Sequence, residues 1–167
     1  MAVLTNITPE HLDYHKTIDE YANAKKAFFD SLPETAFALA NIDDEYGEFM
    51  IKDSVATHVT YAEGKGDFDF TVKESTSAGV TVNIKDTTVT SPLVGKFNAY
   101  NLAAIFATAV LLDQPKDKVA DLLSSLTGAR GRMEKIIGVS GKIGIVDYAH
   151  TPDALDNALT TVNNFKG

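Results

Sequence analysis

Apolar residues recur at every second position in much of the stretch between residues 55 and 89. The alternation continues on both sides of a Ser77-Ala78-Gly79 turn, through Phe68, Phe70 and Val72 and then Val80, Val82 and Ile84. Because a period of two is typical of strands with one buried face, this stretch predicts an antiparallel hairpin or a small meander. A second hairpin is predicted where two apolar runs, 136–139 and 143–146, flank Ser140-Gly141.

Helical patterns fall between these strand patterns. A capping box, Thr17-Ile18-Asp19-Glu20, predicts a helix start, and Thr8-Pro9-Glu10 predicts an earlier one. Further helices are expected at 98–112, at 118–126 and from 151 towards 165. A short apolar run at 37–42 predicts a buried strand. Helices that interleave with strands, together with one antiparallel stretch, indicate an α/β fold.

The composition is typical of a globular protein, with 167 residues of which 44% are hydrophobic and 23% charged. A net charge of −8 argues against general affinity for nucleic acid or for an anionic membrane surface. The absence of cysteine excludes disulfides and thiolate metal sites. The longest apolar run, 102–112, is shorter than the ~20 residues of a membrane span. Because the N-terminus also lacks the basic segment of a secretion signal, we expect a cytoplasmic protein.

Lys25 stands out because helical spacing places it within an apolar stripe. The stripe of the helix that follows Thr17 consists of Ile18, Tyr21, Ala22, Phe28, Phe29 and Leu32. The same spacing directs Lys26 away from this stripe. In one interpretation the stem of Lys25 lies along the stripe and its ammonium group is in water. In the other, Lys25 is a desolvated amine with a lowered pKa that can act as a nucleophile or be modified.

Other motifs carry weaker candidate chemistry. His11 and His15 would share one helical face and could bind a metal, although such a pair is more often structural or solvent-facing. Gly95-Lys96 lacks the spacing of a Walker phosphate loop, so we expect a turn glycine followed by a helix-capping asparagine. The string DYAHTPD at 147–153 follows a buried strand and precedes a helix. Because α/β proteins bind ligands at such positions, we favour a site there over an ordinary strand-to-helix turn.

Three further polar residues receive structural interpretations. His58 lies alone in a predicted strand. Asp43 and Asp44 are expected to serve a turn and the first turn of a helix.

Six strings of the sequence resemble the Mur ligases in order and spacing, and most closely the MurE branch of that family. They are TNITPEHLDYH (5–15), EYANAKKAFF (20–29), NIDDE (41–45), GKFNAYNLAAIFA (95–107), GRME (131–134) and VDYAHTPDAL (146–155). The resemblance implies a cytoplasmic enzyme that uses ATP and magnesium to extend a UDP-linked peptidoglycan precursor. In this branch the third residue, diaminopimelate or lysine, is added to UDP-N-acetylmuramoyl-L-alanyl-D-glutamate. The substrate carboxylate becomes an acyl phosphate, which the incoming amine attacks.

The resemblance also implies roles for particular residues. His11 resembles a metal-liganding histidine of the family. Lys25 resembles a lysine that carbon dioxide carbamylates, which turns a cation into the kind of oxygen ligand that magnesium prefers. Five residues are expected to contact the nucleotide: Asn98, Asn101, Arg132, Asp147 and His150.

In the fold that the resemblance implies, residues 1–129 are the later part of the central ATPase domain. This part is a mainly parallel partial sheet with helices and a small antiparallel sub-sheet. Residues 130–167 are then the first hairpin and helix of a C-terminal Rossmann-like domain. The family's phosphate loop, its UDP-binding domain and the motif that selects the third amino acid have no counterpart in this sequence.

Two expectations follow from these missing parts. Because the backbone amides of a phosphate loop are missing, we expect this chain alone to neither hydrolyse ATP nor ligate. Exposed sheet edges and apolar helix faces are expected to favour self-association. The alternative interpretations are a related ligase such as a folylpolyglutamate synthase, or a non-catalytic binding module that reuses the fold.

Overall fold

The structure is a computed structural model that describes residues 1–9 and 14–164. Its strands are β1 (Ala2–Leu4), β2 (Phe37–Asn41), β3 (Thr57–Glu63), β4 (Phe68–Thr76), β5 (Gly79–Ile84), β6 (Thr87–Ser91), β7 (Glu134–Ile137) and β8 (Ile143–Val146). Its helices are α1 (Ile18–Asp30), α2 (Gly47–Ile51), α3 (Phe97–Leu111), α4 (Lys116–Ser124) and α5 (Pro152–Asn163). The predicted α/β class is confirmed. Within the described residues, no helix combines the length and the apolar character that crossing a membrane requires.

Six strands form one sheet in the order β1-β2-β3-β4-β5-β6. Strands β1 to β4 pair in parallel, whereas β5 and β6 are antiparallel to their neighbours. The antiparallel meander predicted within 55–89 is therefore confirmed for β4 to β6 and wrong for β3. That strand pairs in parallel with β2, because the segment containing α2 returns the chain to the end of the sheet at which β2 began.

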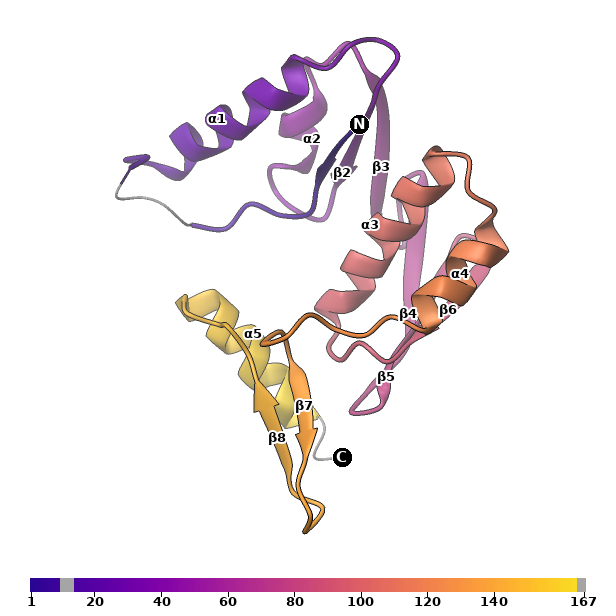
Figure 1. Ribbon diagram of the computed structural model, residues 1–167. Helices are drawn as coiled ribbons and strands as arrows, with labels where there is room; N and C mark the ends of the chain where they lie inside the picture. Colours follow the sequence, from indigo (N-terminus) through magenta and orange to yellow (C-terminus); the bar gives the residue numbers. More distant parts are fainter. Residues whose placement is uncertain (10–13, 165–167) are drawn as a thin grey trace.

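Helices cover both faces of this sheet (Figure 1). Along β2, Ala38 and Ala40 belong to the core shared with α1 and α2, whereas Leu39 belongs to the core shared with α3 and α4. The alternation of side chains along one strand thus supplies two separate cores. The core under α3 and α4 contains the largest fully buried side chains, including Tyr61 and Phe70.

The helix starts within the described residues are largely where the sequence predicts them, and the helix predicted from Thr8-Pro9-Glu10 lies outside those residues. Thr17 Oγ1 accepts a hydrogen bond from Glu20 N at the start of α1, and Thr151 caps α5 in the same way. The cap predicted for α3 is wrong. Because Gly95 turns the chain with a φ of 101°, α3 begins at Phe97, and Asn98 lies within its first turn.

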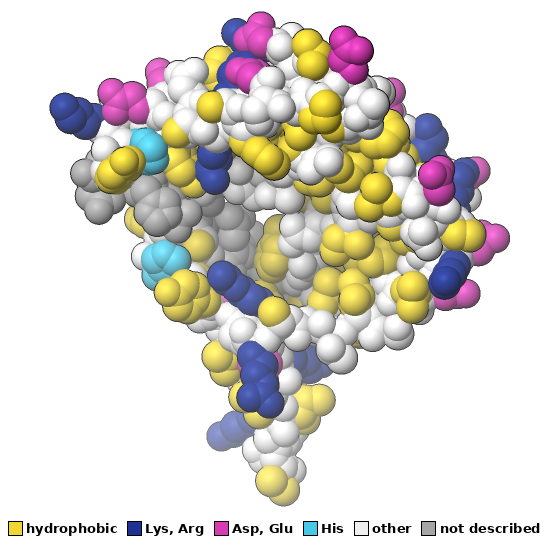
Figure 2. All heavy atoms as spheres, turned by 45° about the horizontal axis from the view of Figure 1, so that its top comes forward, with side chains coloured by type: hydrophobic (Ala, Val, Ile, Leu, Met, Phe, Trp, Pro, Cys, Tyr) yellow, Lys and Arg dark blue, Asp and Glu magenta, His cyan; other side chains and the backbone are white. Residues whose placement is uncertain are grey.

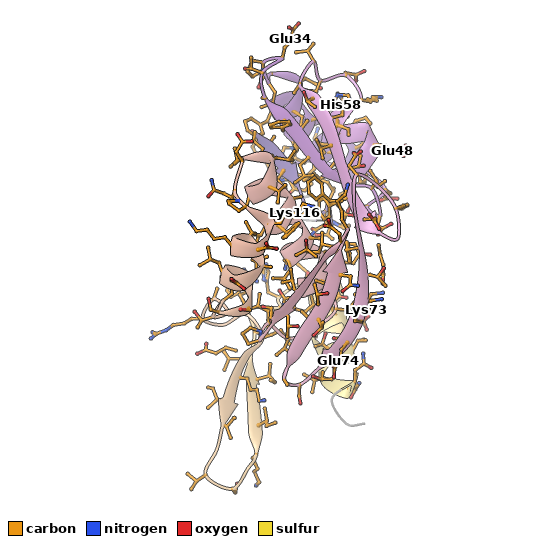
Figure 3. The ribbon with its side chains drawn as sticks, turned by 90° about the vertical axis from the view of Figure 1, so that its right-hand side faces the viewer. Glu34, Glu48, His58, Lys73, Glu74 and Lys116 are labelled. Carbon is orange, nitrogen blue, oxygen red and sulfur yellow. The ribbon has the colours of Figure 1, made fainter. Side chains whose placement is uncertain are left out.

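The C-terminal part of the described chain forms a smaller unit. Strands β7 and β8 pair as a separate antiparallel hairpin, which confirms the second predicted hairpin. Figure 3 shows this hairpin extending away from the larger sheet, at the end of the molecule opposite Glu34 and His58. Most of its apolar side chains are exposed, among them Ile137 at 68%.

Candidate functional site

The carboxyl ends of β1 and β2 lie side by side because these two strands are parallel. The segments that leave them, within residues 5–8 and 41–44, form one wall of a cleft of about 560 Å³. The remaining walls come from the start of α3, from the joint before β7 (Arg132 and Met133), from Asp147 after β8, and from α5 with its cap. Figure 2 shows the molecule hollowed between its larger part and the tapering hairpin, with Lys, Arg and His side chains along one side. A polar cleft at this end of parallel strands is where α/β proteins bind ligands.

A hydrogen-bonded network around Asp43 fixes one side of this cleft. Asp43 Oδ2 accepts hydrogen bonds from Glu63 N at 2.8 Å and from Tyr100 Oη at 3.0 Å, and Asp43 Oδ1 lies 3.1 Å from Lys65 Nζ. Burial by itself raises the pKa of Asp43, but these donors and the Lys65 charge together hold it below its ordinary value. Burial and the bond to Asp43 raise the pKa of Tyr100. The network joins the ends of β2 and β3 to the first turn of α3.

Asn41 and Asp44 hold the loop that follows β1. Asn41 Nδ2 donates a hydrogen bond to the carbonyl oxygen of Thr5 over 2.9 Å, and Ile7 N donates to Asp44 Oδ2 over 2.9 Å. Asp44 Oδ1 also accepts a hydrogen bond from Tyr46 N, immediately before α2. Asn41 is buried although polar, and it is satisfied because its Oδ1 also accepts a hydrogen bond from Asp43 N over 3.0 Å. The bonds to Thr5 and Ile7 fix the chain at the edge of the cleft as far as Ile7.

Asn98 and Asn101, which the sequence resemblance assigns to a nucleotide base, lie near the start of α3. Asn101 Nδ2 donates a hydrogen bond to Asn98 Oδ1 over 3.1 Å, and Asn98 Nδ2 donates to the carbonyl oxygen of Val94 over 2.7 Å. Both asparagines line a second hollow of about 940 Å³ that adjoins the first. Its other walls are mostly apolar and come from β1, α3 and the segment 127–129. A flat ring with polar edges suits such a surface.

Asp147 fastens the joint before β7 to the turn after β8. Asp147 Oδ2 accepts a hydrogen bond from Met133 N, and Oδ1 accepts one from Ala149 N, both over 2.8 Å. Met133 has a φ of 47°, in the left-handed region that residues other than glycine seldom adopt. Gly131 N donates to Glu134 Oε2 across the same bend. Arg132 lies between Gly131 and Met133 and is therefore held on a sharply folded backbone.

Arg132 lies where the two hollows meet, because it lines both. It is the only positively charged side chain among the described residues that line them, whereas the first cleft is also lined by three carboxylates. Its Cζ lies 5.1 Å from the centre of the Tyr148 ring. His150 is not among the described lining residues. Its Nδ1 lies 2.9 Å from the carbonyl oxygen of Tyr148, and because a carbonyl can only accept, Nδ1 carries the proton.

The structure corrects the orientation predicted for the two lysines of α1. Lys26, at 5% exposure, is buried, whereas Lys25 is exposed. Lys25 Nζ lies 4.8 Å from the centre of the Tyr21 ring. The prediction that Lys25 lies within the apolar stripe is wrong, because the buried face of the helix runs through Ala22, Lys26 and Phe29.

Lys26 is buried because two carboxylates compensate its charge. Its Nζ lies 2.5 Å from Asp30 Oδ1 and 2.9 Å from Asp53 Oδ2. Burial by itself lowers the pKa of Lys26, but the hydrogen bonds and charges of these carboxylates outweigh it and raise the pKa above its ordinary value. Lys26 therefore stays charged and ties α1 to the segment that follows α2.

The predicted site residues divide into two groups. Asn98, Asn101, Arg132 and Asp147 come together around the two adjoining hollows. Lys25 is not among the described residues that line them, and His11 lies outside the described part of the chain. In the part that is described, no three His, Asp or Glu side chains are grouped as ligands of a metal ion. The metal-binding roles of His11 and Lys25 stay predictions.

A comparison with known families identifies the fold. Residues 1–109, more than half of the chain, match the model of the Mur ligase middle domain. The chain belongs to the Mur ligase family. It is 46% identical over 166 residues to the UDP-N-acetylmuramoyl-L-alanyl-D-glutamate–2,6-diaminopimelate ligase of Cytophaga hutchinsonii. It is 36% identical over 176 residues to the protein of the same name from Bacillus cereus.

These alignments cover 99% of this Mur ligase chain but only 34% and 36% of the two relatives, so the chain spans about a third of their length. A solved structure of a UDP-N-acetylmuramoyl-L-alanyl-D-glutamate–2,6-diaminopimelate ligase superposes with a TM-score of 0.77 and 34% identity, over 97% of this chain and 35% of that one. MurF from Acinetobacter baumannii gives a TM-score of 0.86 at 21% identity, over 97% of this chain and 37% of that one, which shows the shared fold.

The described residues fit one end of ATP better than the other. The apolar second hollow, with two asparagine amides at its edge, suits a nucleoside base. The first cleft presents Asp43, Asp44 and Asp147 against a single guanidinium, so its net charge opposes a triphosphate. These carboxylates already accept hydrogen bonds from the protein. These residues do not by themselves hold a triphosphate and its magnesium ion.

Sequence reasoning missed that Asp43, Asp44 and Tyr100 line the cleft. A usable signal was present for the two aspartates, because they directly follow a buried strand. That is the same position in the fold by which the sequence singled out Asp147. Tyr100 gave no such signal, since its contact with Asp43 joins residues that are far apart in the sequence.

Proposed function

We propose that this chain is the nucleotide-facing segment of a cytoplasmic, ATP-dependent Mur ligase of the MurE type. The enzyme that contains this segment would join 2,6-diaminopimelate to UDP-N-acetylmuramoyl-L-alanyl-D-glutamate. The observation that carries the proposal is the 46% identity, over nearly the whole chain, to a relative of that name. It is supported by the arrangement of Asn98, Asn101, Arg132 and Asp147 around two adjoining hollows.

The proposal gives each of these residues a separate task. ATP, when bound, supplies the phosphoryl group that activates the substrate carboxylate. We assign the amides of Asn98 and Asn101 to the edges of the base, because they lie at the rim of the apolar hollow. Arg132 is assigned to the negative charge of the nucleotide at the junction of the two hollows. Asp147 keeps Arg132 in place through its hydrogen bond to Met133 N, and His150 is proposed as a further nucleotide contact.

His11 and Lys25 are proposed for the metal end of the site on the sequence resemblance. Lys25 is exposed in the structure, so it lacks the apolar surroundings that the sequence pattern predicted for it. We therefore expect unmodified lysine at position 25 in the purified chain, and intact-mass measurement checks this. A stable carbamate on the chain alone would show that the segment activates Lys25 without the rest of the enzyme.

A division of the chain into residues 1–129 and 130–167 is also part of the proposal. It is supported by the separation of the sheet β1–β6 from the sheet β7–β8, and by the bend at 131–134 that connects them. Limited trypsin digestion tests it: first cleavage at Arg130 or Arg132 would support a joint there, and first cleavage within α1 or α3 would contradict it.

The decisive test is a chimeric ligase in which this chain replaces the aligned third of the Cytophaga hutchinsonii protein. With precursor, diaminopimelate and ATP, the chimeric ligase should form ligated product and release phosphate in equal amounts. An Arg132→Lys chimera keeps the charge but loses the planar guanidinium, and it should be slower. Exchange of the exposed Lys73 for Arg serves as the matched control and should leave the rate unchanged.

Two results would count against the proposal. A chimeric ligase that folds and binds the precursor but forms no product would show that this segment does not perform the family's chemistry. Product formation by the 167-residue chain alone would contradict the expectation that this segment needs the rest of the enzyme.

A further inference from the structure

The position of the Arg132 guanidinium depends on side-chain contacts as well as on the backbone. Its guanidinium forms no salt bridge among the described residues, although three carboxylates line the same cleft. The bend at Met133 and the Asp147 hydrogen bond fix the main chain on one side of Arg132. A long side chain on a fixed backbone still has several rotatable bonds. A side-chain contact is needed to hold the guanidinium at the junction of the two hollows.

Tyr148 provides that contact. The Arg132 Cζ lies 5.1 Å from the centre of the Tyr148 ring, within the range of a cation–π interaction. Tyr148 directly follows Asp147, so the hydrogen bond that joins Asp147 to Met133 also brings the ring alongside Arg132. Tyr148 is 63% exposed, so its ring is not needed to fill the core. The ring therefore contributes mainly to the position of Arg132 and little to the stability of the fold.

The same tyrosine also contacts His150. The two rings lie 4.8 Å apart with an interplanar angle of 60°, and the His150 Nδ1 donates a hydrogen bond to the Tyr148 carbonyl oxygen. Arg132 and His150 lie in different loops, and Tyr148 touches both. One residue thus connects His150 to Arg132, the side chain that lines both hollows and faces the carboxylates among the described lining residues.

We propose that Tyr148 is a positioning residue, whose ring holds the Arg132 guanidinium and the His150 imidazole as one unit, with the guanidinium at the junction of the two hollows. The role of this unit towards a nucleotide rests on the proposed function, whereas the contact between the rings and the guanidinium does not. Loss of the ring frees Arg132 and weakens its interaction with the ligand. Loss of the tyrosine hydroxyl alone leaves the unit intact, because the π face makes the contact with Arg132.

Arginine side-chain NMR on the 167-residue chain tests the contact directly. The sequence contains two arginines, so Arg130 is an internal reference for Arg132 in the same spectrum. The Arg132 signals should lie upfield because of the tyrosine ring current, should stay there in Tyr148→Phe and should move to ordinary positions in Tyr148→Leu. Arg132 chemical shifts that stay the same in both variants would overturn the proposal, whatever the activity of the protein.

Kinetics of the chimeric ligase test the consequence for the nucleotide. Tyr148→Leu should raise KM for ATP about two- to five-fold, the loss expected for an exposed cation–π contact, and Tyr148→Phe should restore the parent value. In an Arg132→Lys background, Tyr148→Leu should cost clearly less, because the planar partner of the ring is gone. An equal loss in both backgrounds would mean a purely structural role and would overturn the proposal. An inactive parent chimera would instead refute the proposed function, while the NMR result still decides whether Tyr148 holds Arg132.

Discussion

The six-stranded sheet and the β7–β8 hairpin contain similar apolar residues in strands but bury them to very different degrees. Phe70 and Val82 in the large sheet are fully buried, whereas Ile137 and Val139 in the hairpin segment are exposed. Helices cover both faces of the large sheet (Figure 1). A pattern of apolar residues therefore predicts a strand. Whether its side chains are buried depends on helices that cover the sheet, and the strand's own sequence does not encode these.

The strongest test of this comparison removes one apolar side chain from each region. Phe70→Ala should lower the free energy of unfolding by about 3–5 kcal/mol, because it leaves a cavity in the core. Ile137→Ala should change it by less than about 0.5 kcal/mol, because this side chain is already in contact with solvent. Urea unfolding followed by circular dichroism measures both. Similar losses for the two variants would show that the hairpin is covered in solution.

The neighbouring lysines of α1 repeat the contrast on a smaller scale. Lys26→Met should lower the unfolding free energy by about 1–3 kcal/mol, because it removes the hydrogen bonds to Asp30 and Asp53. Lys25→Met is the matched control one residue away and should cost less than about 1 kcal/mol, because Lys25 is exposed. A larger loss of stability for Lys25→Met than for Lys26→Met, in thermal or urea unfolding, would show that Lys25 is the buried lysine, as the sequence predicted.

The pH dependence of stability should come from the ionised groups around Lys26 and around Asp43. The folded pKa values of Asp43 and Asp53 lie below the ordinary 3.8, so the stability that they contribute is complete above that value and is lost as pH falls through the folded pKa. The raised pKa of Lys26 contributes stability that is complete below 10.5 and is lost as pH rises through the folded pKa. The free energy of unfolding, measured with urea at a series of pH values, should be constant at intermediate pH. It should fall at acid pH (the acid limb) and at alkaline pH (the alkaline limb).

Single substitutions distinguish the groups behind these two limbs. Asp43→Asn should flatten part of the acid limb and leave the alkaline limb unchanged, whereas Lys26→Met should flatten the alkaline limb and also part of the acid limb, because Lys26 lowers the pKa of Asp53. An acid limb of unchanged steepness in Asp43→Asn would show that the network around Asp43 does not stabilise the fold. We expect these effects to be smaller than the loss of the Lys26 contacts at neutral pH, since Asp43 is partly solvated.

Substitution of the exposed apolar residues should change the stability of the fold very little, but it should change self-association measurably. At high concentration the chain is expected to self-associate through the β1 edge or the hairpin, and light scattering measures this. Val139→Lys should reduce association if the hairpin is responsible, and Val3→Lys should do so if the β1 edge is responsible. A strict monomer at high concentration would contradict the prediction.

Local signals predicted the elements well, because each lies within a few residues of the structure that it determines. The Thr17 and Thr151 caps and the turn at Ser140-Gly141 are of this kind. The parallel pairing of β3 was not predictable from its alternation, since that depends on the path of the chain through α2. The order of strands in the sheet likewise emerged only with the structure.

The burial of Lys26 was missed for a similar physical reason. Phe28 and Phe29 are adjacent, and including Phe28 in the apolar stripe rotates its centre towards Lys25. In the structure Phe28 is 58% exposed and Phe29 is buried. Asp30, four residues after Lys26, was a visible signal. Asp53 was not, because it approaches from the segment beyond α2.

Asp147 was predicted as a site residue from its place between a strand and a helix, and Asn101 from the family resemblance alone. The contacts that position the segments that contain them were not predicted. Tyr100 reaches Asp43 across 57 positions of sequence, and Asp147 reaches Met133 across 14. Such contacts follow from the fold and have no local pattern.

The affinity of the chimeric ligase for ADP tests the central claim, that the hollows beside Asn101 and Arg132 bind the nucleotide, most directly. Isothermal titration should show about two- to ten-fold weaker binding for Asn101→Leu, the loss expected when one uncharged hydrogen bond is removed. Asn23→Leu, on the exposed side of α1, should bind as tightly as the parent. Equal ADP affinity in the parent and in Asn101→Leu would contradict the account.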